Sequence, residues 1–211
     1  METKNRETRV FDFEMRAKES EEHGHFIEGR PIVFETDTDL GYYTERINRH
    51  ALDNADLKDV RFLVNHDTSM IPLARSRNNN ANSTMQMEVG EEGMDIRVDL
   101  DVEGNSDAKN LYSAISRGDV SGMSFMFTVE EDKWSDLLSE MPKREILKIR
   151  KVFEVSAVTF PAYEQTSIEA ASASEALERA KETLESVQAA ERCNELRDQI
   201  KNLIGGNSND D

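Results

Sequence analysis

The chain has 211 residues, of which 37% are hydrophobic and 33% charged, and 43 Asp and Glu against 26 Lys and Arg give a formal net charge of −17. Phosphate backbones repel such a chain, which excludes direct nucleic-acid binding as its main activity. No apolar run approaches the roughly 18 residues that cross a bilayer. We also expect no secretory signal, and the single Cys193 excludes an internal disulfide.

Alternation of apolar and polar residues predicts strands over much of the chain. In the first of them Phe11, Phe13 and Met15 face one way, while Asp12 and Glu14 face the other. The expected strands cover residues 10–15, 26–34, 60–64, 120–129, 146–152 and 154–160, with a hairpin over residues 84–102. The last two strands could also form one long bent strand.

Two helices are expected in the same region. One covers residues 46–54. The other covers residues 105–117, with Ser106 or Asp107 as its cap and Gly118 ending it in the left-handed conformation. The polar segments expected to be irregular cover residues 16–25, as a loop, and residues 130–143, as an insertion or flap.

Many strands with few helices between them predict a mainly β, α+β fold with peripheral helices, not a doubly wound sheet. Gly29 and Pro31 interrupt one strand and predict a bulge or an edge there. Between Ser83 and Glu103, seven acidic residues stand against Arg97. This pattern is typical of a solvated sheet face, and a docking surface for basic substrate segments is the alternative.

The chain changes character after Thr166. The predicted organisation is a strand and polar segment at 1–25, a main domain at 26–166, a small-residue linker at 167–174, an amphipathic helix at 175–204 and a disordered tail at 205–211. Apolar residues of the helix follow steps of three and four: Leu177, Ala180, Leu184, Val187, then Cys193, Leu196, Ile200, Leu203. The step from Val187 to Cys193 breaks the phase. The stripe could pack on the main domain, form a self-associating coil or bind a partner.

Three segments far apart in the chain each hold one residue type of a hydrolytic triad. Serine is a weak nucleophile that needs an imidazole to take its proton, and a third group fixes the imidazole tautomer. His66 is the candidate base. Ser124 is the candidate nucleophile, with Ser121 as its alternative, and Glu154 is the candidate carboxylate, with Ser156 as its alternative. A buried hydroxyl or carboxylate needs a partner, and His66 would serve both.

A metal site is not expected. His23 and His25 are one residue apart in a predicted surface loop, far from Cys193, which is a poor zinc ligand set. The chain also lacks a glycine-rich phosphate loop and a dinucleotide fingerprint. We therefore expect no metal and no cofactor.

In their order, the triad segments resemble the prohead proteases of tailed bacteriophages, serine peptidases that are distantly similar to the herpesvirus assemblins. The resemblance covers roughly residues 26–165. It is carried by the segments Glu28–Phe34, Glu45–Ile47, His50–Leu52, Asn65–Asp67, Ile71–Arg75, Gly118, Ser121–Phe125 and Glu154–Ala162. Ala74 and Met126 depart from it, since the family commonly has glycine at both positions, and Met126 puts a bulky side chain near the site.

The resemblance implies a closed or nearly closed assemblin-like β-barrel over residues 26–166. It implies a serine endopeptidase, needing no cofactor, that cleaves scaffold and major capsid protein segments, and itself, inside an assembling procapsid in the host cytoplasm. We expect a homo-oligomer with no membrane partner. Assemblins use a second histidine as third member, and none follows His66 here, so the third position departs from the assemblin triad. The alternative is a non-enzymatic procapsid assembly or scaffolding protein, with a barrel and a helical tether.

Overall fold

The computed structural model describes residues 6–11, 15–159 and 167–205. Contacts divide the chain into two compact units, Met1–Ala173 and Ser174–Asp211. The strands of the larger sheet are β1 (Arg6–Phe11), β4 (Thr38–Asp39), β5 (Thr44–Ile47), β6 (Asp59–Val64), β7 (Ala74–Arg77), β10 (Gly122–Ser135) and β11 (Lys143–Val158). The smaller sheet contains β2 (Arg16–Ser20), β3 (Gly24–Val33), β8 (Met85–Val89) and β9 (Gly93–Asp99). The helices are α1 (Ser106–Ser116) and α2 (Ser167–Gly205).

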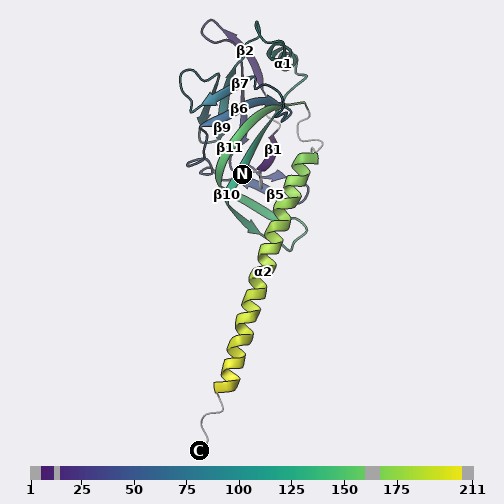
Figure 1. Cartoon of the computed structure of the whole chain (residues 1–211). Coiled ribbons are helices and arrows are strands. Elements are labelled where there is room, and N and C mark those ends of the chain that lie inside the picture. Colours follow the sequence, from purple (N-terminus) through teal and green to yellow (C-terminus); the bar gives the residue numbers. More distant parts are fainter. Residues whose placement is uncertain (1–5, 12–14, 160–166, 206–211) are drawn as a thin grey trace, which may run out of the picture. The chain divides into compact units, whose positions relative to one another are not determined.

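The larger sheet is organised around β11, a 16-residue strand that bends beside β10 (Figure 1). Along one edge β11 pairs antiparallel with β10, which in turn pairs with β1. Along the other edge its first part pairs in parallel with β5 and its last part in parallel with β6. The long strand β11 thus lies between β10, which carries β1 on its far side, and β6, which leads into the segment of His66.

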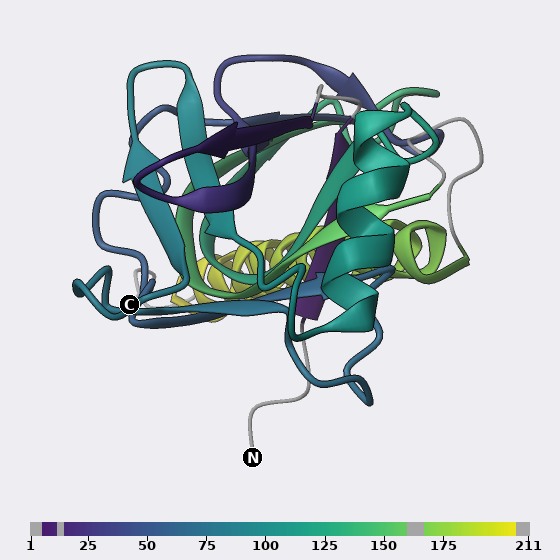
Figure 2. The same cartoon turned by 90° about the horizontal axis from the view of Figure 1, so that it is seen from above.

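The predicted mainly β fold with peripheral helices is confirmed, but the closed barrel is not. The strands form two separate hydrogen-bonded sheets, and among the described residues no ladder joins them into a ring. The sheets meet at corners through single backbone bonds, such as that from the amide of Glu35 to the carbonyl of Ile47 at 2.9 Å. Seen from above, the strands curve around a shared core with α1 beside them (Figure 2).

The core between the sheets is rich in methionine. Met85, Met94 and Met123 are fully buried. Gly29 is what makes room for Met123, because a Cβ at position 29 would lie 2.4 Å from the Met123 sulfur. The pairing of β3 with β9 shifts register after Gly29, which confirms the predicted bulge.

Helix α1 packs Ala108, Leu111 and Ile115 into the core. Its cap is Asn105, not Ser106 or Asp107 as predicted, because Asn105 has extended backbone angles and its side chain accepts from two amides of the first turn. Gly118 has φ 78° and its amide bonds back to Ile115, so the left-handed ending is confirmed.

Three local predictions are wrong. Residues 46–54 are not helical, because Ile47 pairs in parallel with Ile146 and the chain then makes a series of four-residue turns. The loop expected at 16–25 contains the edge strand β2. The insertion expected at 130–143 is mostly the extended end of the β10–β11 hairpin. In each case tertiary strand pairing overrides a polar local sequence.

Helix α2 also differs from its prediction. It begins at Ser167, so the segment 167–174 that was expected to be a linker is helical. Apolar residues do not gather on one face of the whole helix. The reason is the phase break: the two apolar groups are 16 positions apart, which at 100° per residue turns the second roughly 160° away from the first. Residues 206–211 of the predicted tail lie outside the described residues.

Candidate active site

The parallel pairing of β6 with β11 brings the histidine and carboxylate segments together. Ala157 pairs with Val64, and Glu154 lies three residues earlier in β11. Parallel strands end at the same edge of a sheet. The residues that follow Val64 therefore emerge beside the end of β11, which places His66 next to Glu154 although 88 positions separate them.

The turn that carries His66 has an uncommon backbone. The φ angle is 50° at Asn65 and 59° at His66, and the amide of Asp67 donates to the carbonyl of Val64 at 3.1 Å. Positive φ at both central residues is the mark of a type I′ turn. Such conformations cost on the order of 1–3 kcal/mol for residues other than glycine and persist only when neighbouring contacts hold them.

Those contacts come from the end of β11. The Asn65 amide donates to the carbonyl of Ala157 at 2.9 Å. Its side-chain oxygen accepts the Thr159 amide at 3.0 Å, and its side-chain NH₂ donates to the Thr159 hydroxyl at 2.8 Å. Backbone and side chain of Asn65 together hold the turn against the strand that carries Glu154. Sequence analysis missed this role, and the asparagine next to His66 was its only signal.

His66 and Glu154 form a short buried contact. Nδ1 of His66 lies 2.5 Å from Oε1 of Glu154, and their side chains are 9% and 3% exposed. An ionised carboxylate only accepts, so Nδ1 carries the proton and Nε2 of the neutral ring keeps its lone pair. Nε2 is buried and, among the described residues, has no hydrogen-bond partner. A general base has this arrangement, with one nitrogen fixed and the other ready to accept.

Ser124 lies on the same face of the larger sheet as Glu154 and Ser156. It stands directly opposite Ser156 in the β10–β11 pairing and is fully buried. Opposite residues of an antiparallel pair share a face, with Cβ atoms roughly 4.5–5.5 Å apart. The Ser124 hydroxyl donates to the carbonyl of Arg9 in β1 at 2.8 Å. Nucleophile and base candidates therefore share a surface, but in this state the serine proton points to β1 and not to His66.

The alternative residues have other places. Ser121 precedes β10. The hydroxyl of Ser156 donates to the second oxygen of Glu154, Oε2, at 2.5 Å, and accepts the backbone amide of His66 at 3.2 Å. Ser156 contacts the carboxylate and the main chain, not the imidazole ring. Of the third segment, Phe160, Pro161 and Ala162 lie outside the described residues.

Comparison with known proteins bears on this arrangement. A family model described as "Caudovirus prohead serine protease" matches residues 11–182. The chain belongs to this family. It is 32% identical over 146 residues to the prohead protease of Enterobacteria phage HK97, and the matched stretch covers 68% of this chain but only 59% of the HK97 protein. The solved capsid assembly protease gp21 of bacteriophage T4 aligns over 73% of this chain and 98% of its own at 13% identity, but its TM-score of 0.35 is too low to carry weight.

One departure from the prohead protease pattern lies in the site. Met126 stands directly opposite Glu154 in the β10–β11 pairing and is partly buried. Its side chain shares the face of Glu154 and Ser124, next to a bulge at Phe153 where β11 shifts register. Bulges near functional sites re-aim the side chains beside them. The sequence-based expectation that Met126 lies near the site agrees with this position.

A second cluster of buried charges was missed from the sequence. Arg9 contacts Glu45 at 2.5 Å and Glu7 at 2.7 Å, and Arg144 contacts the same two carboxylates at 3.0 and 2.5 Å. All four side chains are at most 3% exposed. Tyr43 accepts a bond from Arg9 at 3.1 Å. We call these five residues the ionic cluster.

The ionic cluster shifts the pKa values of its members. Burial by itself lowers the pKa of Arg9, but the attraction of Glu45, with smaller contributions from Tyr43 and Glu7, more than offsets it and the net pKa is raised. Burial also opposes the charge of Arg144, but the attraction and hydrogen bond of Glu7, followed by Glu45 and Tyr43, raise its net pKa. Both guanidiniums are therefore charged at any accessible pH, and their role is structural pairing, not proton transfer.

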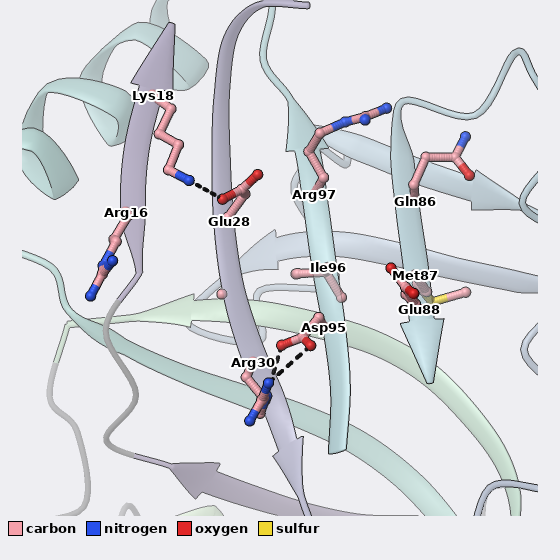
Figure 3. A pocket seen from close by; sticks show the side chains of 11 residues that line it. Arg16, Lys18, Glu28, Arg30, Gln86, Met87, Glu88, Asp95, Ile96 and Arg97 are labelled. Carbon is pink, nitrogen blue, oxygen red and sulfur yellow. Dashed lines mark hydrogen bonds and ion pairs between the residues drawn. The ribbon is translucent and has the colours of Figure 1, made fainter. Parts of the chain in front are cut away.

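A hollow of about 1010 Å³ lies elsewhere, on the outer face of the smaller sheet (Figure 3). Arg30 forms a two-point contact with Asp95, and Lys18 pairs with Glu28 across the floor of this hollow. Arg30 of β3 thus partly neutralises the acidic hairpin of β8 and β9, since it pairs with Glu92 as well as with Asp95. None of the triad candidates lines this hollow.

The two histidines of the predicted loop are used in packing. His23 Nε2 lies 3.3 Å from Arg97, and the His25 ring meets Tyr112 edge to face at 4.9 Å. Within residues 6–11, 15–159 and 167–205, no group of three or more His, Cys, Asp or Glu side chains could hold a metal ion. Neither described helix has a stretch long and apolar enough to span a bilayer.

Proposed function

We propose that this chain is a serine endopeptidase in which Ser124 is the nucleophile, His66 the general base and Glu154 the group that orients the imidazole. One observation carries the proposal. Nδ1 of His66 lies 2.5 Å from the buried Glu154, while Nε2 has no partner in the described part of the chain. Membership of the prohead serine protease family supports it.

The chemistry follows from these positions. The Ser124 hydroxyl turns from the Arg9 carbonyl toward Nε2, and its proton passes to Nε2 as Oγ bonds to the carbonyl carbon of the scissile peptide. Glu154 stabilises the resulting imidazolium. His66 then gives the proton to the leaving amine as the C–N bond breaks, which leaves an ester on Ser124. Water repeats the sequence: it gives a proton to Nε2, attacks the ester, and Oγ recovers the proton as the acid leaves.

Rotation of the Ser124 hydroxyl from the Arg9 carbonyl to Nε2 of His66 has a low cost in free energy. A hydrogen bond contributes about 0.5–1.5 kcal/mol net, so exchanging the Arg9 carbonyl for Nε2 of His66 is close to neutral. The exchange also supplies the partner that buried Nε2 lacks. Catalytic hydrogen bonds commonly tighten only when substrate is bound.

For substrates, we propose scaffold segments and N-terminal segments of the major capsid protein, cut inside the assembling procapsid in the host cytoplasm. Support comes from the HK97 relative, which is called a prohead protease. The proposal is tested by co-expressing the chain with the matching capsid protein and reading products by mass spectrometry. Intact capsid protein in the presence of labelled, active enzyme would exclude this substrate.

We also propose that the enzyme cuts itself between residues 165 and 180. Helix α2 covers Ser167–Gly205, and helical peptide bonds are protected because their polar groups are paired within the helix. Local opening costs least at a helix end, so the N-terminal end of α2 is where a cut is expected. The fragment should be seen by intact-mass analysis of wild type and be absent from Ser124→Ala; the same cut in purified Ser124→Ala would assign it to another protease.

Self-association is the remaining part of the proposal. Leu196 and Ile200 of α2 are 58% and 54% exposed, and they lie one helical turn apart on the same face of the helix. We infer that they contact a second copy. A Leu196→Ser, Ile200→Ser double variant should sediment as a smaller species than wild type at equal concentration. Equal sedimentation coefficients would remove this helix as the contact.

The catalytic assignment is tested by covalent labelling with a fluorescent fluorophosphonate. Ser124→Ala should lose labelling and capsid processing, because removing the nucleophile of such a triad costs on the order of 10⁶ in turnover. Ser121→Ala is the matched control and should label like wild type. Wild-type labelling of Ser124→Ala would reject the assignment.

One observation favours a second candidate function. The Ser124 hydroxyl donates to the Arg9 carbonyl and not to His66. If that state is permanent, the chain is a non-enzymatic procapsid assembly protein. Absence of any fluorophosphonate labelling in wild type, with normal assembly of shells by Ser124→Ala, would favour this alternative.

A further inference from the structure

Ser156 connects the two parts that hold His66 in place. Its hydroxyl donates to Oε2 of Glu154 at 2.5 Å, and its oxygen accepts the backbone N–H of His66 at 3.2 Å. The other carboxylate oxygen, Oε1, binds Nδ1 of the same histidine at 2.5 Å. The bonds close a ring from the His66 main chain through Ser156 and Glu154 to the His66 side chain.

We propose that Ser156 is a positioning residue of the active site: it fixes the rotation of the Glu154 carboxylate and the backbone of His66 with one hydroxyl. This inference rests on the proposed peptidase function. Ser156 is fully buried and its hydroxyl proton is engaged by Glu154. It is therefore neither a competing nucleophile nor the group that binds the imidazole.

The backbone of His66 explains why such a residue is needed. Its φ of 59° is costly for a side chain with a Cβ and must be held by specific contacts. Thr159 holds Asn65, the first central residue of the turn, while the amide of His66 donates to the hydroxyl oxygen of Ser156. Without that acceptor, the amide of His66 would lose its hydrogen bond, and the costly turn would lose one of the contacts that hold it.

The carboxylate needs the same hydroxyl for a different reason. Glu154 is 3% exposed, and a buried carboxylate oxygen without a donor is strongly disfavoured. With Oε2 bound to Ser156, the plane of the carboxylate is set and Oε1 faces Nδ1. If Oε2 had no donor, the Glu154 carboxylate could rotate, and the imidazole of His66 would no longer be held in one position. A displacement of about 1 Å at a reacting group can cost on the order of 10² in rate.

Threonine and valine at position 156 provide a matched test, since the two side chains have nearly the same shape and only threonine has a hydroxyl. The readout is the fluorophosphonate reaction of the full chain, separated into the rate constant of the bound complex and the binding constant. For Ser156→Val we expect a loss on the order of 10² in the rate constant, with the binding constant unchanged. Ser156→Thr should remain within a few-fold of wild type.

Two further variants distinguish loss of the Ser156 hydroxyl from the effects of added side-chain volume in a buried strand. Ser156→Ala removes the hydroxyl without adding volume and should behave like Ser156→Val, so it decides the matter if the valine variant does not fold. Ser76→Val replaces another fully buried strand serine and should leave the labelling rate unchanged. Equal rates for Ser156→Thr and Ser156→Val, whether both normal or both reduced, overturn the positioning role. Wild-type labelling of Ser124→Ala instead overturns the proposed function itself.

Discussion

Two clusters of buried polar groups share Arg9 of β1: its side chain belongs to the ionic cluster, and its carbonyl accepts the Ser124 hydroxyl. The clusters differ in one respect. In the ionic cluster both guanidiniums and both carboxylates are paired with one another. Around His66, the carboxylate, the serine hydroxyl and Nδ1 are all bonded, but Nε2 is left without a partner among the described residues. Arg9 pairs with Phe125 and its neighbour Val10 with Ser124, so the side chains of Arg9 and Ser124 point to opposite faces of the sheet.

The difference indicates what each cluster is for. A fully paired buried cluster contributes fold specificity and little net free energy, because desolvation offsets the attraction. A buried acceptor with no partner costs stability and is retained where it does chemistry. The contrast predicts that breaking the ionic cluster unfolds the protein, whereas breaking the His66 cluster stops the reaction and leaves the fold intact.

The largest expected effect is that of His66→Ala. It should reduce fluorophosphonate labelling and processing by about 10⁶, as much as Ser124→Ala, and the double variant should be hardly worse because triad members act as a unit. Thermal unfolding, followed by circular dichroism, should be close to wild type. An additive loss in the double variant would separate His66 from Ser124.

Glu154→Gln should follow, with a loss on the order of 10⁴, because a glutamine can donate to Nδ1 and so stabilise the wrong tautomer. The measurement is the labelling rate, at protein concentrations where wild type reacts fully. Retention of full activity would leave a serine–histidine pair without a third member and would assign Glu154 to structure.

The ionic cluster should show the opposite behaviour. Arg9→Met should lower the free energy of unfolding by about 3–5 kcal/mol, since it removes one partner of Glu7 and Glu45 and leaves their charges buried. Urea denaturation measures this. Lys148→Met, which breaks the exposed pair with Glu131, is the control and should change stability by less than about 1 kcal/mol. Similar values for both variants would show that burial of the cluster has no energetic consequence.

How far the sequence leads can be judged from the same two clusters. His66, Ser124 and Glu154 could be proposed from the sequence because short motifs carry them in a known order, and in the structure His66 contacts Glu154. The positioning role that we propose for Ser156 could not be predicted from the sequence, because a serine at this place in the strand could contact the imidazole ring or the carboxylate. Only the register of β6, β10 and β11 decides between these.

The ionic cluster was missed for a physical reason. Alternation assigns charged residues to the wet face of a strand, and Glu7 and Arg9 lie in a strand whose two faces are both buried. The sequence cannot show that Glu45 and Arg144, distant in the chain, neutralise them. Local predictions also failed where pairing overrode polarity, at β2 and β5. The hairpin of β8 and β9 succeeded because its own alternation and turn were sufficient.

The smallest expected effect concerns alkaline pH and Tyr43. Burial, first of all, raises the pKa of this phenol above its ordinary value, with Glu45 and Glu7 adding to burial and Arg9 and Arg144 opposing it. Because the folded pKa is raised, the contribution of Tyr43 to stability is complete below the unfolded value of roughly 10 and is lost as the pH rises above it, by at most about 1.4 kcal/mol per pH unit.

Tyr43→Phe should be less stable than wild type at pH 8, since Arg9 loses an acceptor, and this difference should shrink between pH 9 and pH 11. Urea midpoints of both proteins across that range measure it, with the 44% exposed Tyr42 as the control through Tyr42→Phe. A pH-independent difference would mean that the phenol stays neutral in both states and that the ionic cluster does not couple to its titration.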